Sequence, residues 1–388
     1  MNRLAENKIS FVAKCTVLLL LIVLLPALPA RAFVIKPTYD SSVTNLTNAA
    51  QVEAAFGVAM DMFTNQFTNA ITVNITVYWG DTGPFTGGID LGASQAEAVG
   101  SIIPPFGYPQ LTNALRALRS SAADTNSVAS LPASDPTPPG TQWFVPRAEA
   151  KMFSFFVTNF PSSSFSPNDT NTDGEVGFAS DESYTFDPTN RAVPGEYDFI
   201  GVAEHEISEV LGRSTYGLNV STNYMPYDLF RFTNNGARSF DFYATNAYFS
   251  VNNGATALKN FNPYYTGGDI QDWTMNTPED SFDAFVSAGH QLVISEADIT
   301  ALDILGYNSP KIPSPRLTGL TMTNGAVWFS FTNAPGLSYT VLTATNVALS
   351  MTNWSVLGEP VEGPAGHFQF TDPQGATNGQ RFYRVSSP

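Results

Sequence analysis

The chain has 388 residues, of which 18 are basic and 34 are acidic, so its formal net charge is −16 at pH 7. This acidic balance argues against a nucleic-acid-binding protein, which needs basic patches for the phosphates, and against attraction to an anionic lipid surface. Hydrophobic residues make up 43% of the chain. A chain of this length and composition is expected to fold into two or three domains rather than to stay disordered.

The first 32 residues have the pattern of a secretory signal peptide. Basic residues precede an apolar run at Val17–Leu25, and a small-residue cleavage site follows at residues 30–32. We expect cleavage before Phe33 rather than a membrane anchor, because the apolar run is too short to cross a bilayer. We expect no membrane span in the mature chain, because no later segment is long and apolar enough. The one cysteine, Cys15, would leave with the signal. The predicted location is extracellular, secreted from a bacterium, with cell-surface association left open.

Hydrophobic periodicity predicts helices and strands in the following order. Apolar residues at helical spacing predict helices at 48–67, 111–118, 148–156, 199–211 and 295–306. Alternating residues predict one long strand at 71–79 and short strands at 176–178 and 184–186. Gly212 is placed to end the helix at 199–211, and Ser295 with Asp298 is placed to cap the helix at 295–306.

The proline-containing stretch at 309–316 predicts a linker between a domain at 33–308 and a second one at 317–388. Short, regularly spaced strands in the second domain predict a β-sandwich of the immunoglobulin or fibronectin kind. These strands are expected at 320–322, 327–331, 339–344, 354–357, 368–370 and 381–385. Because residues 33–308 mix helices with strands, the predicted fold class is α+β.

The segment at 205–212 reads His-Glu-Ile-Ser-Glu-Val-Leu-Gly and carries the chemistry of the chain. On a helix, His205 and Glu209 lie one turn apart on the same face, where they could converge on one divalent cation, most simply zinc. Glu206 lies beside them and could activate a water molecule. Glu204 adds a third carboxylate near the histidine, so we expect a positive partner for the cluster. Two other interpretations are an acidic, solvated helix face and a metal-free hydrolase with paired carboxylates.

This motif resembles the active-site helix of the metzincin zinc proteases, such as the serralysins and matrixins, which read H-E-x-x-H-x-x-G-x-x-H. More closely, residues 33–308 resemble a bacterial group of secreted metalloprotease-like proteins. The resemblance lies in residues 197–212, 228–231, 268–273 and 298–307. It implies a zincin fold, with a twisted sheet and an active-site helix, one zinc ion, and a peptide or protein substrate. By the same match, Glu206 is the general base, Met225 forms the floor of the metal site and Tyr227 faces it.

The sequence departs from the metzincin pattern at two ligand positions. Glu209 stands where the second histidine would be, and Thr215 stands where the third would be. The chain has only three histidines in total, so this helix cannot build a site of three histidines. The third ligand is left unassigned, and the nearest candidates are Tyr227 and Asp228.

The residues Asp169, Asn171 and Asp173 match the first half of a calcium-binding loop, which makes calcium a second candidate cofactor. The closing glutamate is missing, because Ser180 occupies its position. The alternative is a turn rich in Asp and Asn between two strands. In the metzincin-like picture this turn leads into an edge strand at 175–180, which could hold an extended peptide.

Residues 315–388 resemble the small β-sandwich modules appended to many secreted proteins of Verrucomicrobia-like bacteria. That resemblance leaves a passive spacer and a carbohydrate-binding module open. For the whole chain, the leading prediction is a secreted zinc-dependent metalloendopeptidase in which Glu206 is the catalytic base. The alternative is an inactive pseudoprotease that binds peptides or surfaces outside the cell.

Overall fold

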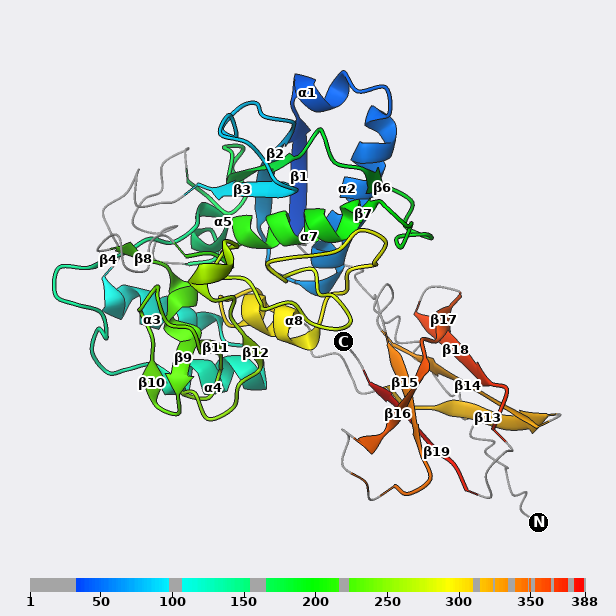
Figure 1. Cartoon of the computed structure of the whole chain (residues 1–388). Coiled ribbons are helices and arrows are strands. Elements are labelled where there is room, and N and C mark those ends of the chain that lie inside the picture. Colours follow the sequence, from blue (N-terminus) through cyan, green and yellow to red (C-terminus); the bar gives the residue numbers. More distant parts are fainter. Residues whose placement is uncertain are drawn as a thin grey trace, which may run out of the picture. The chain divides into compact units, whose positions relative to one another are not determined.

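The computed structural model describes most of the chain after the predicted signal segment. The described residues are 33–97, 107–153, 165–215, 223–309, 315–323, 325–333, 339–347, 349, 353–363, 366–375 and 380–386. The predicted signal at 1–32 and most of the predicted linker lie outside them. Helices and several sheets are both present, so the chain is of the predicted α+β class (Figure 1). Within the described residues, no helix combines the length and hydropathy needed to cross a membrane.

A four-stranded sheet with the order β1-β2-β5-β3 forms the centre of the part before residue 309. Its strands are β1 (Val34–Tyr39), β2 (Thr72–Trp79), β5 (Gly174–Phe178) and β3 (Gly92–Ala96). The first three are parallel to one another, and β3 runs antiparallel to β5. In β2 alternate side chains are buried, as the sequence pattern predicts.

The prediction that residues 175–180 form an edge strand is wrong. The observed strand β5 lies between β2 and β3, so it is internal and cannot accept a further strand. The edge on this side of the sheet is β3, which falls in a Gly- and Pro-rich stretch where no strand was predicted. Its sequence, Gly-Ala-Ser-Gln-Ala, lacks the β-branched and aromatic residues that indicate a strand.

Two helices pack beside this sheet and form the main core with it. Helix α2 (Ala49–Gln66) buries one stripe of side chains, and α7 (Phe199–Val210) contacts α2, β3 and β5. The ring of Phe199 lies 4.6 Å from that of Phe178, which joins the start of α7 to β5. Burial of such aromatic surfaces is the main source of stability in this region.

Shorter elements complete this part of the chain. The helices are α1 (Ser41–Thr44), α3 (Tyr108–Leu118), α4 (Ala122–Ser130), α5 (Arg147–Ala150), η2 (Pro226–Phe230), η3 (Tyr264–Thr266) and α8 (Glu296–Asp303). The strands are β4 (Gln142–Trp143), β6 (Tyr184–Thr185), β7 (Tyr197–Asp198), β8 (Asn223–Tyr224), β9 (Arg231–Asn234), β10 (Ala237–Arg238), β11 (Tyr248–Phe249) and β12 (Lys259–Asn260). Of the predicted helix at 148–156, only α5 is helical within the described residues.

Two predicted helix ends are confirmed. Gly212 follows α7 with φ +123°, a left-handed conformation that glycine adopts at little cost. At the start of α8, the side chains of Ser295 and Asp298 form a capping box with the backbone. Both ends depend on residues adjacent in sequence, which is why local patterns predict them.

The described residues after 315 form two antiparallel sheets, as expected for a sandwich. The sheet β13-β14-β18-β17 and the sheet β16-β15-β19 share a hydrophobic cluster, in which the ring of Phe329 lies 5.5 Å from that of Tyr383. The strands are β13 (Thr318–Thr323), β14 (Ala326–Thr332), β15 (Thr340–Ala344), β16 (Ser355–Gly358), β17 (Val361–Glu362), β18 (His367–Asp372) and β19 (Phe382–Ser386).

Candidate metal centre

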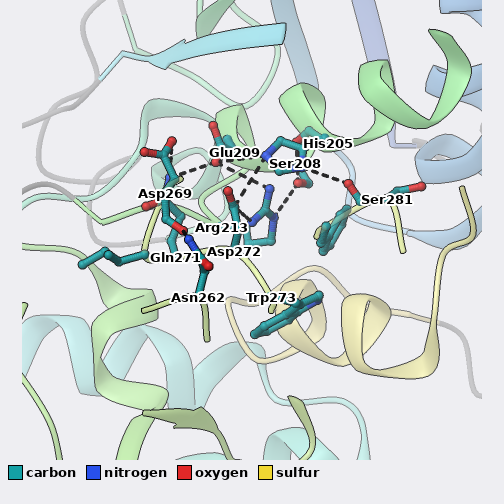
Figure 2. A network of polar contacts seen from close by, with 12 residues as sticks. His205, Ser208, Glu209, Arg213, Asn262, Asp269, Gln271, Asp272, Trp273 and Ser281 are labelled. Carbon is teal, nitrogen blue, oxygen red and sulfur yellow. Dashed lines mark hydrogen bonds and ion pairs between the residues drawn. The ribbon is translucent and has the colours of Figure 1, made fainter. Parts of the chain in front are cut away.

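Three side chains from two distant segments converge beside α7 (Figure 2). The Nε2 atom of His205 lies 3.6 Å from Oε1 of Glu209, one helical turn further on, and 3.5 Å from Oδ1 of Asp272. One ligand atom from each of the three lies within 4.8 Å of the others, which is close enough to share one metal ion. The predicted pair on α7 is therefore brought together with a carboxylate that sequence reasoning did not select.

A backbone contact fixes the orientation of the histidine ring. Nδ1 of His205 lies 2.9 Å from the carbonyl oxygen of Ser281. A carbonyl oxygen can only accept, so Nδ1 carries the proton, and the neutral ring has its lone pair on Nε2, which faces the two carboxylates. A histidine held in this way is oriented as metal-ligating histidines are in known sites.

The carboxylate of Glu209 is held by two neutral donors. The hydroxyl of Ser94, on β3, donates to Oε2 at 2.7 Å, and the amide of Gln271 donates to Oε1 at 3.0 Å. The same amide group lies 3.1 Å from Oδ2 of Asp269. Strand β3 and the loop at 267–272 thus position the ligand on α7 from two sides.

The turn at Gly212 brings a buried arginine under the site. The guanidinium of Arg213 donates to Oδ1 of Asp272 at 2.5 Å and lies 3.5 Å from Oε1 of Glu209. It also stacks over the ring of Phe282, with 4.4 Å between the guanidinium carbon and the ring centre. The positive partner expected for the acidic cluster is therefore present within the chain, whether or not a metal binds.

The charges of these groups shift their pKa values strongly. Burial alone would lower the pKa of His205, but Asp272 and the other neighbouring carboxylates outweigh it and raise that pKa to about 10. Burial would raise the pKa of Glu209, but the hydrogen bond and charge of His205 lower it to about 2. Burial raises the pKa of Asp272 to about 6. Without a metal, these carboxylates therefore favour the protonated form of His205.

Glu206 differs from its neighbours because it has no hydrogen-bond partner among the described residues. Its side chain is buried, with 5% of the residue exposed, yet it lines the pocket beside His205. Burial raises its pKa to about 8, against the lowering effect of the His205 charge. Glu204, by contrast, accepts a hydrogen bond from the Ser281 hydroxyl at 2.8 Å and lies 3.6 Å from Arg191, so it does not contribute to the pocket.

The site opens into a pocket of about 450 Å³. Its walls come from residues 90–94, which include part of β3, from one face of α7, and from the loops at 267–272 and 281–286. Residues 90–94, α7 and these loops come from distant parts of the sequence, so only the folded chain creates this cavity.

The residues that the resemblance placed around the metal lie elsewhere. Asp228 accepts a hydrogen bond from the backbone N–H of Met225 at 2.8 Å, and burial raises its pKa to about 6. Tyr227 packs among aromatic rings, 5.8 Å from that of Phe261, and lines a second, small pocket with Asp228. Met225 is buried but does not line the pocket at His205. The side chain that completes the group with His205 and Glu209 is instead Asp272. Its only sequence signal was its place in the segment 268–273 of the resemblance.

In the loop that resembles a calcium site, basic side chains of the chain itself pair with the carboxylates. The Oδ1 atom of Asp169 lies 2.8 Å from Arg147, and Asp173 forms ion pairs with Arg147 at 3.1 Å and with Lys151 at 2.5 Å. The remaining oxygen of Asp169 accepts from the backbone N–H of Ser166. Asp169 also accepts from the N–H of Asn171, two residues on, as in an Asx turn. The structure thus favours the turn over a calcium site.

Comparison with known proteins adds no assignment. No protein-family model matches the sequence, and no curated protein matches it.

Proposed function

We propose that the chain is a metal-dependent peptide hydrolase with a zincin-like fold. One observation carries this proposal: His205, Glu209 and Asp272 converge in a pocket that also contains Glu206, a buried carboxylate that has no hydrogen-bond partner among the described residues. A site with three ligands and an adjacent free base is the arrangement that metal-assisted hydrolysis requires.

The donor set fits a zinc ion. One imidazole nitrogen and two carboxylate oxygens are acceptable zinc ligands, and the ring of His205 presents Nε2 to both carboxylates. When bound, the metal would polarise the scissile carbonyl and lower the pKa of a water molecule. Ser94, Gln271 and Ser281 would keep the ligands in place through the hydrogen bonds described above.

Glu206 is suited to move the proton. It is held on the same helix as two of the ligands, and no hydrogen bond fixes its carboxylate among the described residues. A base with a pKa raised toward neutrality can take a proton from the attacking water and return it to the leaving amine. These features support the role of general base that the sequence motif implies for Glu206.

The edge strand favours a peptide as substrate. Within the described residues, β3 pairs only with β5, so the backbone groups on its other side are free to bind an extended chain. Its first residues, Gly92 to Ser94, also line the pocket. A peptide added along β3 would pass directly over Glu206 and the metal ligands. Together with the signal-like first 32 residues, this supports a secreted metalloendopeptidase.

A second candidate is a pseudoprotease that binds peptides without cleaving them. The position of Arg213 favours it, because a guanidinium already neutralises the two carboxylate oxygens that face His205. In that case the pocket is stable without a metal, and β3 and the pocket serve only for binding. Metal content and hydrolysis separate the two candidates.

The deciding experiment uses the full mature chain purified without a chelating resin. We expect about one zinc per chain and cleavage of denatured protein substrates. His205→Ala should remove both the metal and the cleavage activity. Glu206→Gln should keep the metal and lower cleavage ~10²–10⁴-fold. His290→Ala and Glu296→Gln are matched controls, since both residues are exposed and neither lines the pocket. Absence of zinc uptake and of cleavage would favour the pseudoprotease.

A further inference from the structure

Apart from His205, the ionisable side chains that line the pocket are acidic among the described residues. Six carboxylates line it, on Asp90, Glu206, Glu209, Asp269, Asp272 and Asp283. No lysine or arginine lines it among the described residues, and Arg213 lies behind two of the ligands. Even with a divalent cation bound, the carboxylates outnumber the positive charges, so the pocket would repel an acidic substrate.

Two of these carboxylates remain available to a ligand. Glu209 and Asp272 both form ion pairs with Arg213. Asp283 accepts hydrogen bonds from Asn276 and from the backbone N–H of Asp280. Asp90 and Asp269 are exposed and come from two different segments of the wall, one before β3 and one in the loop at 267–272, where Asp269 uses Oδ2 to accept a hydrogen bond from the Gln271 amide. Asp90 has no hydrogen-bond or ion-pair partner among the described residues.

Part of the remaining wall is apolar. Its apolar side chains are Leu91, Tyr197, Val202, Phe285, Val286 and Leu292. Of these, Phe285 is 41% exposed, whereas Val202 and Leu292 are buried beneath the surface of the pocket. An apolar wall with carboxylates around it matches one type of amino-acid side chain: a long aliphatic stem that ends in a cation.

We propose that this pocket selects peptides with a lysine or arginine side chain next to the site of attack. The stem would lie along the apolar wall, and the cationic head would reach Asp90 and Asp269. Glu206 is buried and has no hydrogen-bond partner in the part of the chain that the structure describes, which is a second sign that the pocket is built for a ligand rather than for solvent alone. This inference rests on the proposed function for its substrate class, but it concerns recognition and not hydrolysis.

The test separates binding from cleavage. Two fluorescent, alanine-rich decapeptides differ only at a central position, which is lysine in one and norleucine, its uncharged counterpart, in the other. Their binding is measured by anisotropy on the zinc-loaded full chain carrying Glu206→Gln, which cannot cleave them in the proposed mechanism. We expect the lysine peptide to bind about tenfold more tightly, with the ratio falling as salt is raised.

Variants identify the residues responsible. Asp90→Asn and Asp269→Asn should each reduce the lysine-to-norleucine ratio about threefold, and the double variant should bring it close to one. Asp61→Asn is the matched control, because Asp61 is an exposed acid on α2 outside the pocket, and it should keep the full ratio. Zinc content, measured in each variant, checks that Asp269→Asn has not disturbed Gln271 and Glu209.

Each outcome decides one point. Equal binding of the two peptides, no binding of either, or a ratio unchanged in the double variant would overturn the inference. Lysine-selective binding without cleavage of protein substrates by the wild type would leave it standing and overturn the hydrolase proposal. Cleavage without any preference for basic residues would overturn the inference and leave the hydrolase proposal standing.

Discussion

Gly92 and Glu206 occupy adjoining space, so that a Cβ atom at position 92 would overlap the carboxylate of Glu206. The same Cβ would also lie 2.9 Å from the side chain of Val202, which is too close for an ordinary contact. Because Gly92 is on β3 and Glu206 is on α7, the missing side chain lets the strand approach the helix at the point where the proposed base enters the pocket.

Gly92→Ala should therefore displace the base without removing a ligand. We expect kcat/KM for protein substrates to fall about 10²-fold, since a displacement near 1 Å has that effect on catalytic groups, while zinc content stays unchanged. Gly87→Ala is the control, because a Cβ at Gly87 meets nothing within 4 Å. Full activity in Gly92→Ala would show that the position of Glu206 is not critical.

Ser94→Ala tests whether β3 supports the metal centre. The variant removes the hydroxyl that donates to Oε2 of Glu209 at 2.7 Å. Loss of a hydrogen bond to a metal ligand commonly costs 10–100-fold in metal affinity, so we expect a Kd for zinc about tenfold higher. Competition with a fluorescent zinc chelator measures it, with Ser41→Ala, an exposed serine on α1, as the control. An unchanged Kd would mean that Glu209 does not bind the metal.

The buried carboxyl group of Glu149 leads us to predict that the stability of the folded chain depends on pH. Its carboxyl group is fully buried, neither oxygen has a hydrogen-bond partner among the described residues, and burial raises its pKa well above the usual value of 4.5. Above pH 4.5 the unfolded chain loses this proton while the folded chain keeps it, so the contribution of Glu149 to stability falls as pH rises. The slope is up to about 1.4 kcal/mol per pH unit.

Glu149→Gln should remove that slope, because the amide stays neutral at every pH. Urea unfolding at several values between pH 5 and pH 8 measures the difference in the free energy of unfolding between wild type and variant. We expect the variant to gain relative stability as pH rises, and the exposed Glu296→Gln to follow the wild type. A difference that does not change with pH would show that Glu149 is ionised in the folded chain.

The predicted cleavage site can be checked against the fold. The ring of Phe33 packs edge-on at 5.9 Å from that of Phe67 and at 5.7 Å from that of Tyr307. A mature chain that begins at Phe33 would keep this packing intact. We expect the mass of the exported protein to correspond to residues 33–388, and a mature form that retains Met1 would contradict the signal prediction.

Local sequence patterns predicted the structural elements that depend on residues close together in the chain. The helix α7, its end at Gly212 and the cap at Ser295 follow from periodicity and from residues a few positions apart. Strand β3 could not be predicted in this way, because its stability comes from pairing with β5, about 80 positions later in the chain. Asp272 was missed for the same reason: it reaches His205 from a loop more than 60 residues away, and no spacing rule connects the two.

The pairing of Arg147 and Lys151 with Asp169 and Asp173 has a consequence for the conditions under which the chain folds. A loop that depends on dissolved calcium exchanges its ion with the medium, so its order varies with the composition of that medium. Here the counter-ions are covalently part of the chain and sit on or next to α5, at a fixed stoichiometry. If the protein is exported, the order of this loop would not depend on the calcium content of the medium. Among the described residues, that leaves the proposed metal site at His205 as the group through which an external supply of metal could control the proposed activity.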